Sequence, residues 1–236
     1  MMTTASNPSP APRRTLRVAL TIVSVALAAA VYIFWSRTEV AAKSQERIQV
    51  VDENTLAFPA RVDRDGFENG DMAGYHAVVW KDGRAGHDAL FQALVRDVDV
   101  LDAFEALGNR PGNGLTHASW AKRNDPDHEA PKRVLTGPPV EILIRLRPDA
   151  EPVPLADLLE DPGGRGLDLH FGGHRDLIPK WRSGCVVCLY SCPGSKVGNA
   201  TYTIRDFVDG TTRFRVKEGV LPEDGTLVEV LLRRRT

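Results

Sequence analysis

The sequence predicts an α+β fold, mostly antiparallel sheet with one or two short helices, preceded by a single N-terminal transmembrane helix. Beyond residue 48, short apolar segments typical of strands recur about every ten to fifteen residues and are separated by Gly, Pro, Asn and Asp. Segments with helical periodicity are few and short in the same region. Before it stands one long apolar run without a charge. Together these patterns indicate a membrane anchor followed by one folded domain.

The apolar run, VALTIVSVALAAAVYIFW, covers residues 18–35. At about 1.5 Å per residue, a helix of this length spans roughly 27 Å, close to the hydrocarbon thickness of a bilayer. Arg13, Arg14 and Arg17 precede the run, whereas the charges that follow it are mixed in sign. Positive charge favours the cytoplasmic side, so we expect the N-terminus in the cytoplasm and the main domain outside. The lipid bilayer is therefore one expected partner, and a protein of the cell envelope is another.

A cleavable signal peptide is the competing interpretation of the same run. Small residues at 28–30 would suit a cleavage site, but the apolar residues continue through 33–35, which favours an uncleaved anchor. We therefore expect a single-pass membrane protein with its domain on the periplasmic side. Its predicted parts are a disordered cytoplasmic tail at 1–15, an anchor helix at 16–36, a charged stalk at 37–47 and an extracytoplasmic domain at 48–236.

The first part of the domain alternates strand and turn signals. Residues 48–51 and 56–60 are apolar and flank a polar Asp-Glu-Asn turn, so they predict two strands. Residues 63–74 contain Asp-Gly and Asn-Gly dipeptides, which are typical of turns. A further strand is predicted at 75–80, while 87–96 is compatible with either a strand or a helix.

Residues 99–107 predict the clearest helix of the chain. Asp97 or Asp99 is expected to cap its start, and Gly108 or Asn109 to end it in a left-handed turn. The helical spacing of its apolar residues is carried by Val100, Leu101, Phe104 and Leu107.

The second half of the domain opens with a long loop. Residues 109–138 hold many Pro, Gly and Asn residues, and a loop of this length is typical of a functional surface or of disorder. The alternating residues 140–146 predict a strand, and 155–160 predict a short helix. Glycines at 163, 164 and 166 lack the strand-loop-helix setting of a phosphate-binding loop. Further strands are predicted at 167–171, 185–190, 214–217 and 227–232.

All three cysteines of the chain fall within eight residues, at Cys185, Cys188 and Cys192, and Pro193 follows at once. Three soft ligands so close together favour a metal or iron–sulfur site. The spacing matches the last three cysteines of the bacterial ferredoxin run, in which a fourth would stand where this chain has Arg182. An iron–sulfur cluster here would therefore need a ligand that is not a cysteine of this chain.

Zinc is the second cofactor that the cluster predicts, because zinc accepts three cysteines and one histidine. His170 and His174 lie shortly before the cysteines, and either could supply the fourth ligand if two strands pair there. The candidate metal ligands are thus Cys185, Cys188, Cys192, His174 and His170.

Other interpretations of the cysteines remain open. Gly-Cys-Val-Val-Cys-Leu-Tyr has the pattern of a buried strand, in which free cysteines pack as small apolar groups. A regular strand would send Cys185 and Cys188 to opposite faces, so both could bind one ion only if the strand bends or ends near Cys188. In an oxidising compartment, Cys188 and Cys192 could instead form a disulfide and leave Cys185 free. A redox-active thiol is a further alternative.

The remaining features exclude some classes of function. The 30 Lys and Arg residues nearly balance the 31 Asp and Glu residues, so bulk charge gives no reason to expect nucleic-acid binding. Ser183 and Ser195 lack the elbow pattern of a hydrolase serine, and no acid–base pair stands out. We assign no catalytic residue and no organic cofactor, and whether the protein is an enzyme stays open.

Three segments together resemble the YdjY-domain family: HDALF at 87–91, ALGNRPG at 106–112 and GCVVCLYSCP at 184–193. The resemblance covers roughly residues 48–232 and implies a His-containing strand that leads into a helix ending in a Leu-Gly-x-x-Pro-Gly turn. Members of that family are largely uncharacterised, often exported or membrane-anchored, and sometimes labelled ferredoxin-like because of their cysteines. That label implies an iron–sulfur site, while the resemblance itself supports the boundary and location of the domain more than an activity. Our leading hypothesis from the cysteines is a metal- or iron–sulfur-binding accessory module, with electron transfer as its role. The alternative is a non-catalytic binding or scaffold domain of the envelope with structural or disulfide-bonded cysteines.

Overall fold

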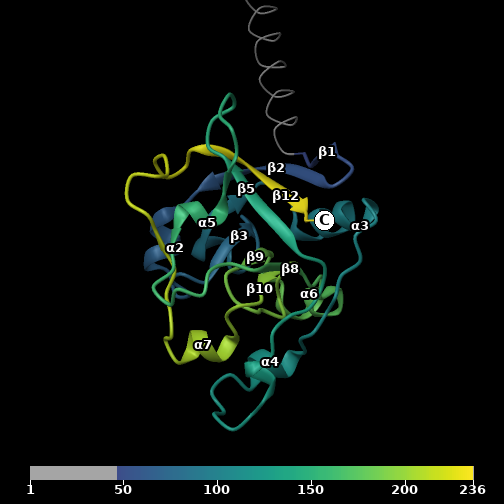
Figure 1. The fold of residues 1–236 in the computed structure, drawn as a ribbon, viewed down its shortest axis with the longest axis vertical. Helices are drawn as coiled ribbons and strands as arrows, with labels where there is room; N and C mark the ends of the chain where they lie inside the picture. The colour runs from purple at the N-terminus through teal and green to yellow at the C-terminus, as the bar shows by residue number, and fades with distance from the viewer. Residues whose placement is uncertain (1–46, 236) are drawn as a thin grey trace, which may run out of the picture. The chain divides into compact units, whose positions relative to one another are not determined.

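The computed structural model describes residues 47–235, and its central feature is one large sheet (Figure 1). Within these residues ten strands belong to it: β1 (Gln49–Asp52), β2 (Thr55–Val62), β3 (His76–Trp80), β4 (Ala89–Ala93), β5 (Val140–Arg145), β6 (Val153–Pro154), β8 (Leu169–Phe171), β9 (Cys185–Cys188), β10 (Val197–Asn199) and β12 (Leu227–Arg234). Their order is β6-β5-β12-β2-β4-β3-β9-β10-β8, and β1 pairs with β2. A small second sheet pairs β7 (Leu159–Glu160) with β11 (Arg215–Val216).

The helices are short, and the longest of the described residues has ten residues. They are α2 (Arg64–Asn69), α3 (Asp97–Ala106), α4 (His117–Ala121), α5 (Leu155–Leu158), α6 (Ile178–Trp181) and α7 (Ile204–Val208), with 3-10 turns at Gly86–Asp88, Ala130–Lys132 and Arg175–Leu177. Only the pairs β3–β4 and β9–β10 of the large sheet are parallel, and its other strand pairs are antiparallel. The predicted α+β domain with a mostly antiparallel sheet is therefore confirmed.

The N-terminal predictions are not tested by this fold. The predicted tail, the anchor helix and all but the last residue of the stalk lie outside the described residues. From residue 47 to residue 235, none of the helices has the length and apolar character needed to cross a bilayer.

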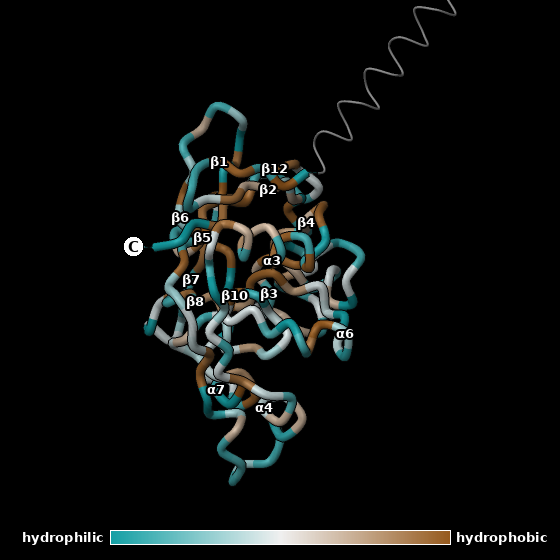
Figure 2. Tube along the Cα trace, turned by 90° about the vertical axis from the view of Figure 1, so that its right-hand side faces the viewer, coloured by the Kyte–Doolittle hydropathy of each residue, from teal (hydrophilic) through white to brown (hydrophobic). Residues whose placement is uncertain are grey.

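The large sheet curls, so that β8 at one end of the strand order reaches the residues directly before β5, near the other end. Pro139, directly before β5, forms an isolated bridge with His170 of β8, and the amide of Phe171 donates to the carbonyl of Pro138 at 2.9 Å. The curled sheet surrounds an apolar core, to which α3 contributes Phe104 in edge contact with Phe171. Figure 2 shows the hydrophobic segments along the strands and α3, with hydrophilic residues on many of the connecting loops.

Helix α3 confirms the clearest helix prediction but corrects its predicted cap. Gly108 follows the helix with φ of 83°, as expected for a left-handed end. The start has no side-chain cap: Asp99 pairs with Arg96 in solvent, and Asp97 is buried against Lys196. The prediction of an Asp cap was wrong because both carboxylates find a cationic partner, which satisfies them better than a backbone amide does.

Several short elements lie in segments predicted as turns or loops. Helix α2 lies within the predicted turn region 63–74, and α4 and one 3-10 turn lie within the predicted loop 109–138. Five or six residues give too few positions for a helical period to show, so only capping signals could mark such helices. The ambiguous segment 87–96 contains the short strand β4, which leads into α3 as the family resemblance implied. His87 is not part of this strand, because it lies in the 3-10 turn that precedes β4.

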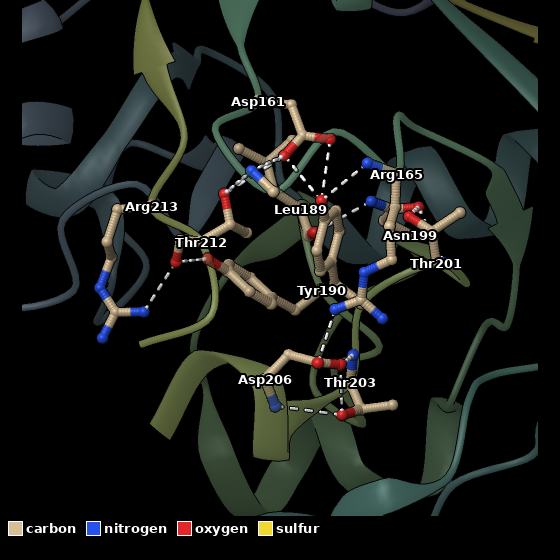
Figure 3. A network of polar contacts seen from close by, with 12 residues as sticks. Asp161, Arg165, Leu189, Tyr190, Asn199, Thr201, Thr203, Asp206, Thr212 and Arg213 are labelled. Atoms are coloured by element: carbon tan, nitrogen blue, oxygen red, sulfur yellow. Dashed lines mark hydrogen bonds and ion pairs between the residues drawn. The ribbon is translucent and has the colours of Figure 1, made fainter. Parts of the chain in front are cut away.

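The glycine-rich loop after β7 is organised by one carboxylate (Figure 3). Asp161 accepts hydrogen bonds from the Tyr202 hydroxyl at 2.7 Å and from the backbone amides of Gly163 and Gly166 at 3.0 and 2.7 Å. The amides of these two glycines are thus engaged within the protein. These bonds hold the loop to Tyr202 and to its own backbone.

Candidate metal centre

Strands β3 and β9 bring together a histidine and two cysteines that lie far apart in the sequence. The two strands pair antiparallel, with His76 opposite Cys188 and Val79 opposite Cys185. The register shifts twice along this pair, around Val78. Such an irregularity changes the direction in which neighbouring side chains point, so that they no longer alternate strictly between the two faces of the strand. It places the Sγ atoms of Cys185 and Cys188 only 2.7 Å apart. The two cysteines can therefore bind one ion, which a regular strand would not allow.

His76 completes a buried group of three ligand atoms. Its Nδ1 lies 3.4 Å from the Sγ of Cys188, across 112 positions of sequence. The Nδ1 or Nε2 atom of His76 and the two sulfurs all lie within 4.8 Å of one another. Both cysteines are fully buried and His76 is 6% exposed. Burial lowers the pKa of His76 to about 3, with a smaller effect from the charge of His87, so the imidazole is neutral and free to donate a lone pair.

The three atoms fit a soft metal ion in part. Thiolate and imidazole ligands of one tetrahedral zinc lie about 3.6 Å apart, and two thiolates about 3.8 Å apart. The distance of 3.4 Å between His76 and Cys188 already matches this spacing. The distance of 2.7 Å between the two sulfurs is shorter, so metal binding requires these side chains to separate by about 1 Å. Two thiolates and a neutral imidazole would balance a divalent ion, which favours its burial.

Cys192 lies beside this group, in the turn after β9. The amide of Gly194 donates to its Sγ at 3.3 Å, and the Ser195 hydroxyl donates to its backbone carbonyl at 2.9 Å. The Cys188 thiol, as the largest influence, and then the Tyr75 hydroxyl and the Gly194 amide lower the pKa of Cys192 to about 7, against the effect of burial. Its sulfur is therefore the one most readily ionised.

The other two thiols differ from Cys192. Burial raises the pKa of Cys185 and raises that of Cys188 well above its usual value. The Cys188 thiol influences the pKa of both other cysteines. A metal ion bound here would have to replace these protons, as metals do at thiol sites.

A pocket of about 240 Å³ reaches the group from one side. Cys192 and His76 contribute to its wall, whereas Cys185 and Cys188 lie behind it. The larger side chains of the wall are Met72, Tyr75, Arg84, Trp120 and Trp181. The pocket therefore connects the cysteine group to the surface through a mostly apolar and aromatic passage.

The two histidines predicted as ligands lie elsewhere. His170 is at the seam of the curled sheet, where its ring nitrogens contact the carbonyl of Gly137 at 2.8 Å and the carboxylate of Asp168 at 2.9 Å. His174 is buried with φ of 28°, and its Nδ1 lies 3.3 Å from the carbonyl of Ser195. Neither histidine belongs to the group of ligand atoms that His76, Cys185 and Cys188 form.

Sequence reasoning placed residues 75–80 in a strand but did not select His76. One histidine at the start of an apolar strand carries no ligand spacing of its own. Only the pairing of β3 with β9 brings it to Cys188. Its neighbour Tyr75, which stacks on Tyr190 with ring centroids 5.0 Å apart, was missed for the same reason.

Comparison with known proteins identifies the family to which this α+β domain belongs. The model of the YdjY domain matches residues 49–233, so the chain belongs to this family. The chain is 32% identical over 156 residues to the "Uncharacterized protein YdjY" of Escherichia coli (strain K12), a match that covers 66% of this chain. It spans 65% of that relative's length. No solved structure matches the chain.

Proposed function

We propose that this protein is a membrane-anchored, extracytoplasmic metal-binding module that serves electron transfer in the cell envelope. The observation that carries the proposal is the convergence of three donor atoms, from His76, Cys185 and Cys188, in a buried group. Imidazole and thiolate together select soft or borderline ions such as zinc, copper and iron. Cys192, beside Cys188, is the candidate for a fourth ligand.

A single ion suits this group better than an iron–sulfur cluster does. A cubane cluster normally takes four cysteine thiolates around a body several ångströms wide. Here two of the three sulfurs are in close contact, and the chain has three cysteines in total. Electron transfer would require an ion with two accessible oxidation states, since zinc has no redox chemistry of its own. When bound, such an ion would accept and release one electron.

The chain's own residues provide the surroundings that such a centre needs. His76 is held neutral by burial, and Cys185 and Cys188 lie within the apolar core, which limits the access of water. The uncharged run at 18–35 and the arginines before it support anchoring with the domain on the periplasmic side. A membrane-bound redox partner would then lie within reach of the domain.

Metal binding is tested on the full-length protein purified without chelator and in reducing buffer. We expect one equivalent of a soft metal by elemental analysis, and a thiolate-to-cobalt charge-transfer band after reconstitution with Co²⁺. Replacing Cys188 with Ser should remove the band, because Cys188 contacts both other ligands. His170→Gln is the matched control and should keep the cobalt band, because His170 lies at the seam of the sheet, where its ring contacts the carbonyl of Gly137.

The second candidate function is a non-catalytic envelope domain with structural cysteines. It is favoured by the complete burial of Cys185 and Cys188 among apolar side chains of the core. A colourless protein that retains no metal, gives no cobalt band and unfolds at the same denaturant concentration with or without metal would support this candidate and refute the first.

A further inference from the structure

The pocket beside the cysteine group exposes one sulfur and conceals two. Cys192 is 7% exposed and lines the pocket, whereas Cys185 and Cys188 are 0% exposed and do not. A molecule that enters the pocket would therefore meet Cys192 first. Cys188 lies four residues before Cys192 in the chain, and its sulfur is 2.7 Å from that of Cys185 in the fully buried part of the group.

A polar atom without a partner lies in the same pocket wall. Tyr75 is 1% exposed and lines the same pocket as Cys192, and its hydroxyl has no hydrogen-bond partner among the described residues. A buried hydroxyl that remains unpaired costs free energy unless something else satisfies it. A ligand at Cys192 could accept this hydrogen bond. The wall thus combines a reachable sulfur with an unused donor.

We propose that, in the protein without a bound metal ion, Cys192 is the attacking thiol of a thiol–disulfide exchange site, with Cys188 as the resolving thiol and a disulfide-bearing polypeptide as the substrate. The walls of the pocket favour this substrate class. Met72, Trp120 and Trp181 present apolar and aromatic surface, which suits apolar side chains next to a disulfide, and Arg84 adds a positive charge to the same wall.

The exchange takes place in two balanced steps. The Cys192 thiolate attacks one sulfur of the substrate disulfide; a mixed disulfide forms, the substrate S–S bond breaks, and the released thiolate takes up the proton that Cys192 lost. Cys188 then loses its proton and attacks the Cys192 sulfur, which forms the Cys188–Cys192 disulfide and releases the second substrate thiol. The substrate gains two electrons and two protons, and the two cysteines lose them.

The position of Cys185 gives the third cysteine a role. Its sulfur lies 2.7 Å from that of Cys188, so it can attack Cys188 and move the disulfide to Cys185–Cys188. The Cys188–Cys192 bond breaks, and the released Cys192 thiolate takes up the proton that Cys185 lost, which leaves Cys192 as a free thiol at the pocket. The oxidised pair is then stored in the core, away from solvent.

The test uses the full-length protein, reduced, treated with chelator and held in detergent micelles. It is mixed with a synthetic peptide disulfide flanked by Leu and Phe, and in a second arm with glutathione disulfide. Wild type is expected to release two thiols per chain and to lose two hydrogens in its intact mass. Cys188→Ser should instead accumulate the mixed disulfide on Cys192, while His170→Gln, a control outside the pocket, should still release both thiols.

Two further variants test the roles of the attacking thiol and of the pocket. Cys192→Ser should slow the first exchange by at least about tenfold, because the remaining sulfurs lack access. Trp181→Ala should slow the peptide disulfide more than glutathione disulfide, with an unchanged circular dichroism spectrum as the check on folding. A wild-type rate in Cys192→Ser, or no trapped adduct in Cys188→Ser, would overturn the exchange site. Faster reaction with glutathione disulfide than with the peptide would overturn the polypeptide substrate.

Discussion

The buried ion pair between Lys196 and Asp97 leads to a quantitative prediction about stability. The two side chains are only 2% and 7% exposed, and the Lys196 ammonium donates to the Asp97 carboxylate. Asp97→Ala removes the partner and leaves a positive charge in the interior. Breaking a buried pair in this way costs about 3–5 kcal/mol, because the remaining charge has lost both water and its counter-ion.

A matched control lies two residues further along the same helix. Asp99 pairs with Arg96 at the surface, where the side chains are 40% and 60% exposed. Such a pair contributes about 0–1 kcal/mol, so Asp99→Ala should cost little. Both aspartates lie in the first turn of α3, so any interaction with the helix dipole is common to both and cancels in the comparison. The expected gap is at least about 2 kcal/mol, or roughly thirtyfold in the unfolding equilibrium.

The assay is urea denaturation of both variants at pH 7 with reductant and chelator, analysed by linear extrapolation. The double variant Asp97→Leu/Lys196→Met removes both charges and keeps similar volume, so it should regain most of the stability that Asp97→Ala loses. If Asp97→Ala costs no more than Asp99→Ala, or if the double variant is less stable than Asp97→Ala, the desolvation reasoning is refuted.

Two predictions concern pH and membrane anchoring. The pKa of His76 is lowered to about 3 in the folded protein. Between pH 6.5 and 3 the unfolded chain therefore binds more protons than the folded chain does, and the unfolding free energy should fall by up to about 1.4 kcal/mol per pH unit on acidification. His76→Phe should flatten this slope. Burial lowers the pKa of His170, but its hydrogen bonds to Gly137 and Asp168 outweigh burial and raise it. The stabilisation that His170 contributes to the fold is therefore present below pH 6.5 and is lost as the pH rises above its folded pKa. His170→Gln should therefore steepen the fall, and denaturation at pH 7, 6 and 5 checks both variants. Deleting residues 1–36 should move the protein from the carbonate-washed membrane fraction to the soluble fraction; a deletion protein that stays with the membrane would contradict the anchor.

Local features of the fold were predictable because they depend on neighbouring residues. The limits of α3 follow from a periodic apolar face and a glycine that tolerates positive φ. Strands β5 and β12 follow from apolar runs that the flanking polar residues delimit. The short helices α2, α4 and α7 were not predictable in this way, because one turn of helix has no period.

The candidate site was predictable in part. The spacing of Cys185, Cys188 and Cys192 along the chain indicated a common centre, since residues so close in sequence stay close in space. The choice of histidine was different: His170 and His174 were nearer in sequence, but His76 is the one that reaches the sulfurs. Sequence distance does not decide which strand lies beside β9.

The amino-acid sequence alone thus indicated the α+β class and the clustering of the three cysteines through local periodicity and spacing, and the family through three segments that resemble it. It also predicts an anchor at residues 18–35 that stays to be tested. The tertiary structure decided that β3 pairs with β9, that the irregular register turns Cys185 and Cys188 to one side, and that Cys192 alone of the three faces a pocket. Strand pairing depends on the burial of the whole core and not on any single segment, which is why only the folded chain assigns His76 to the cysteines.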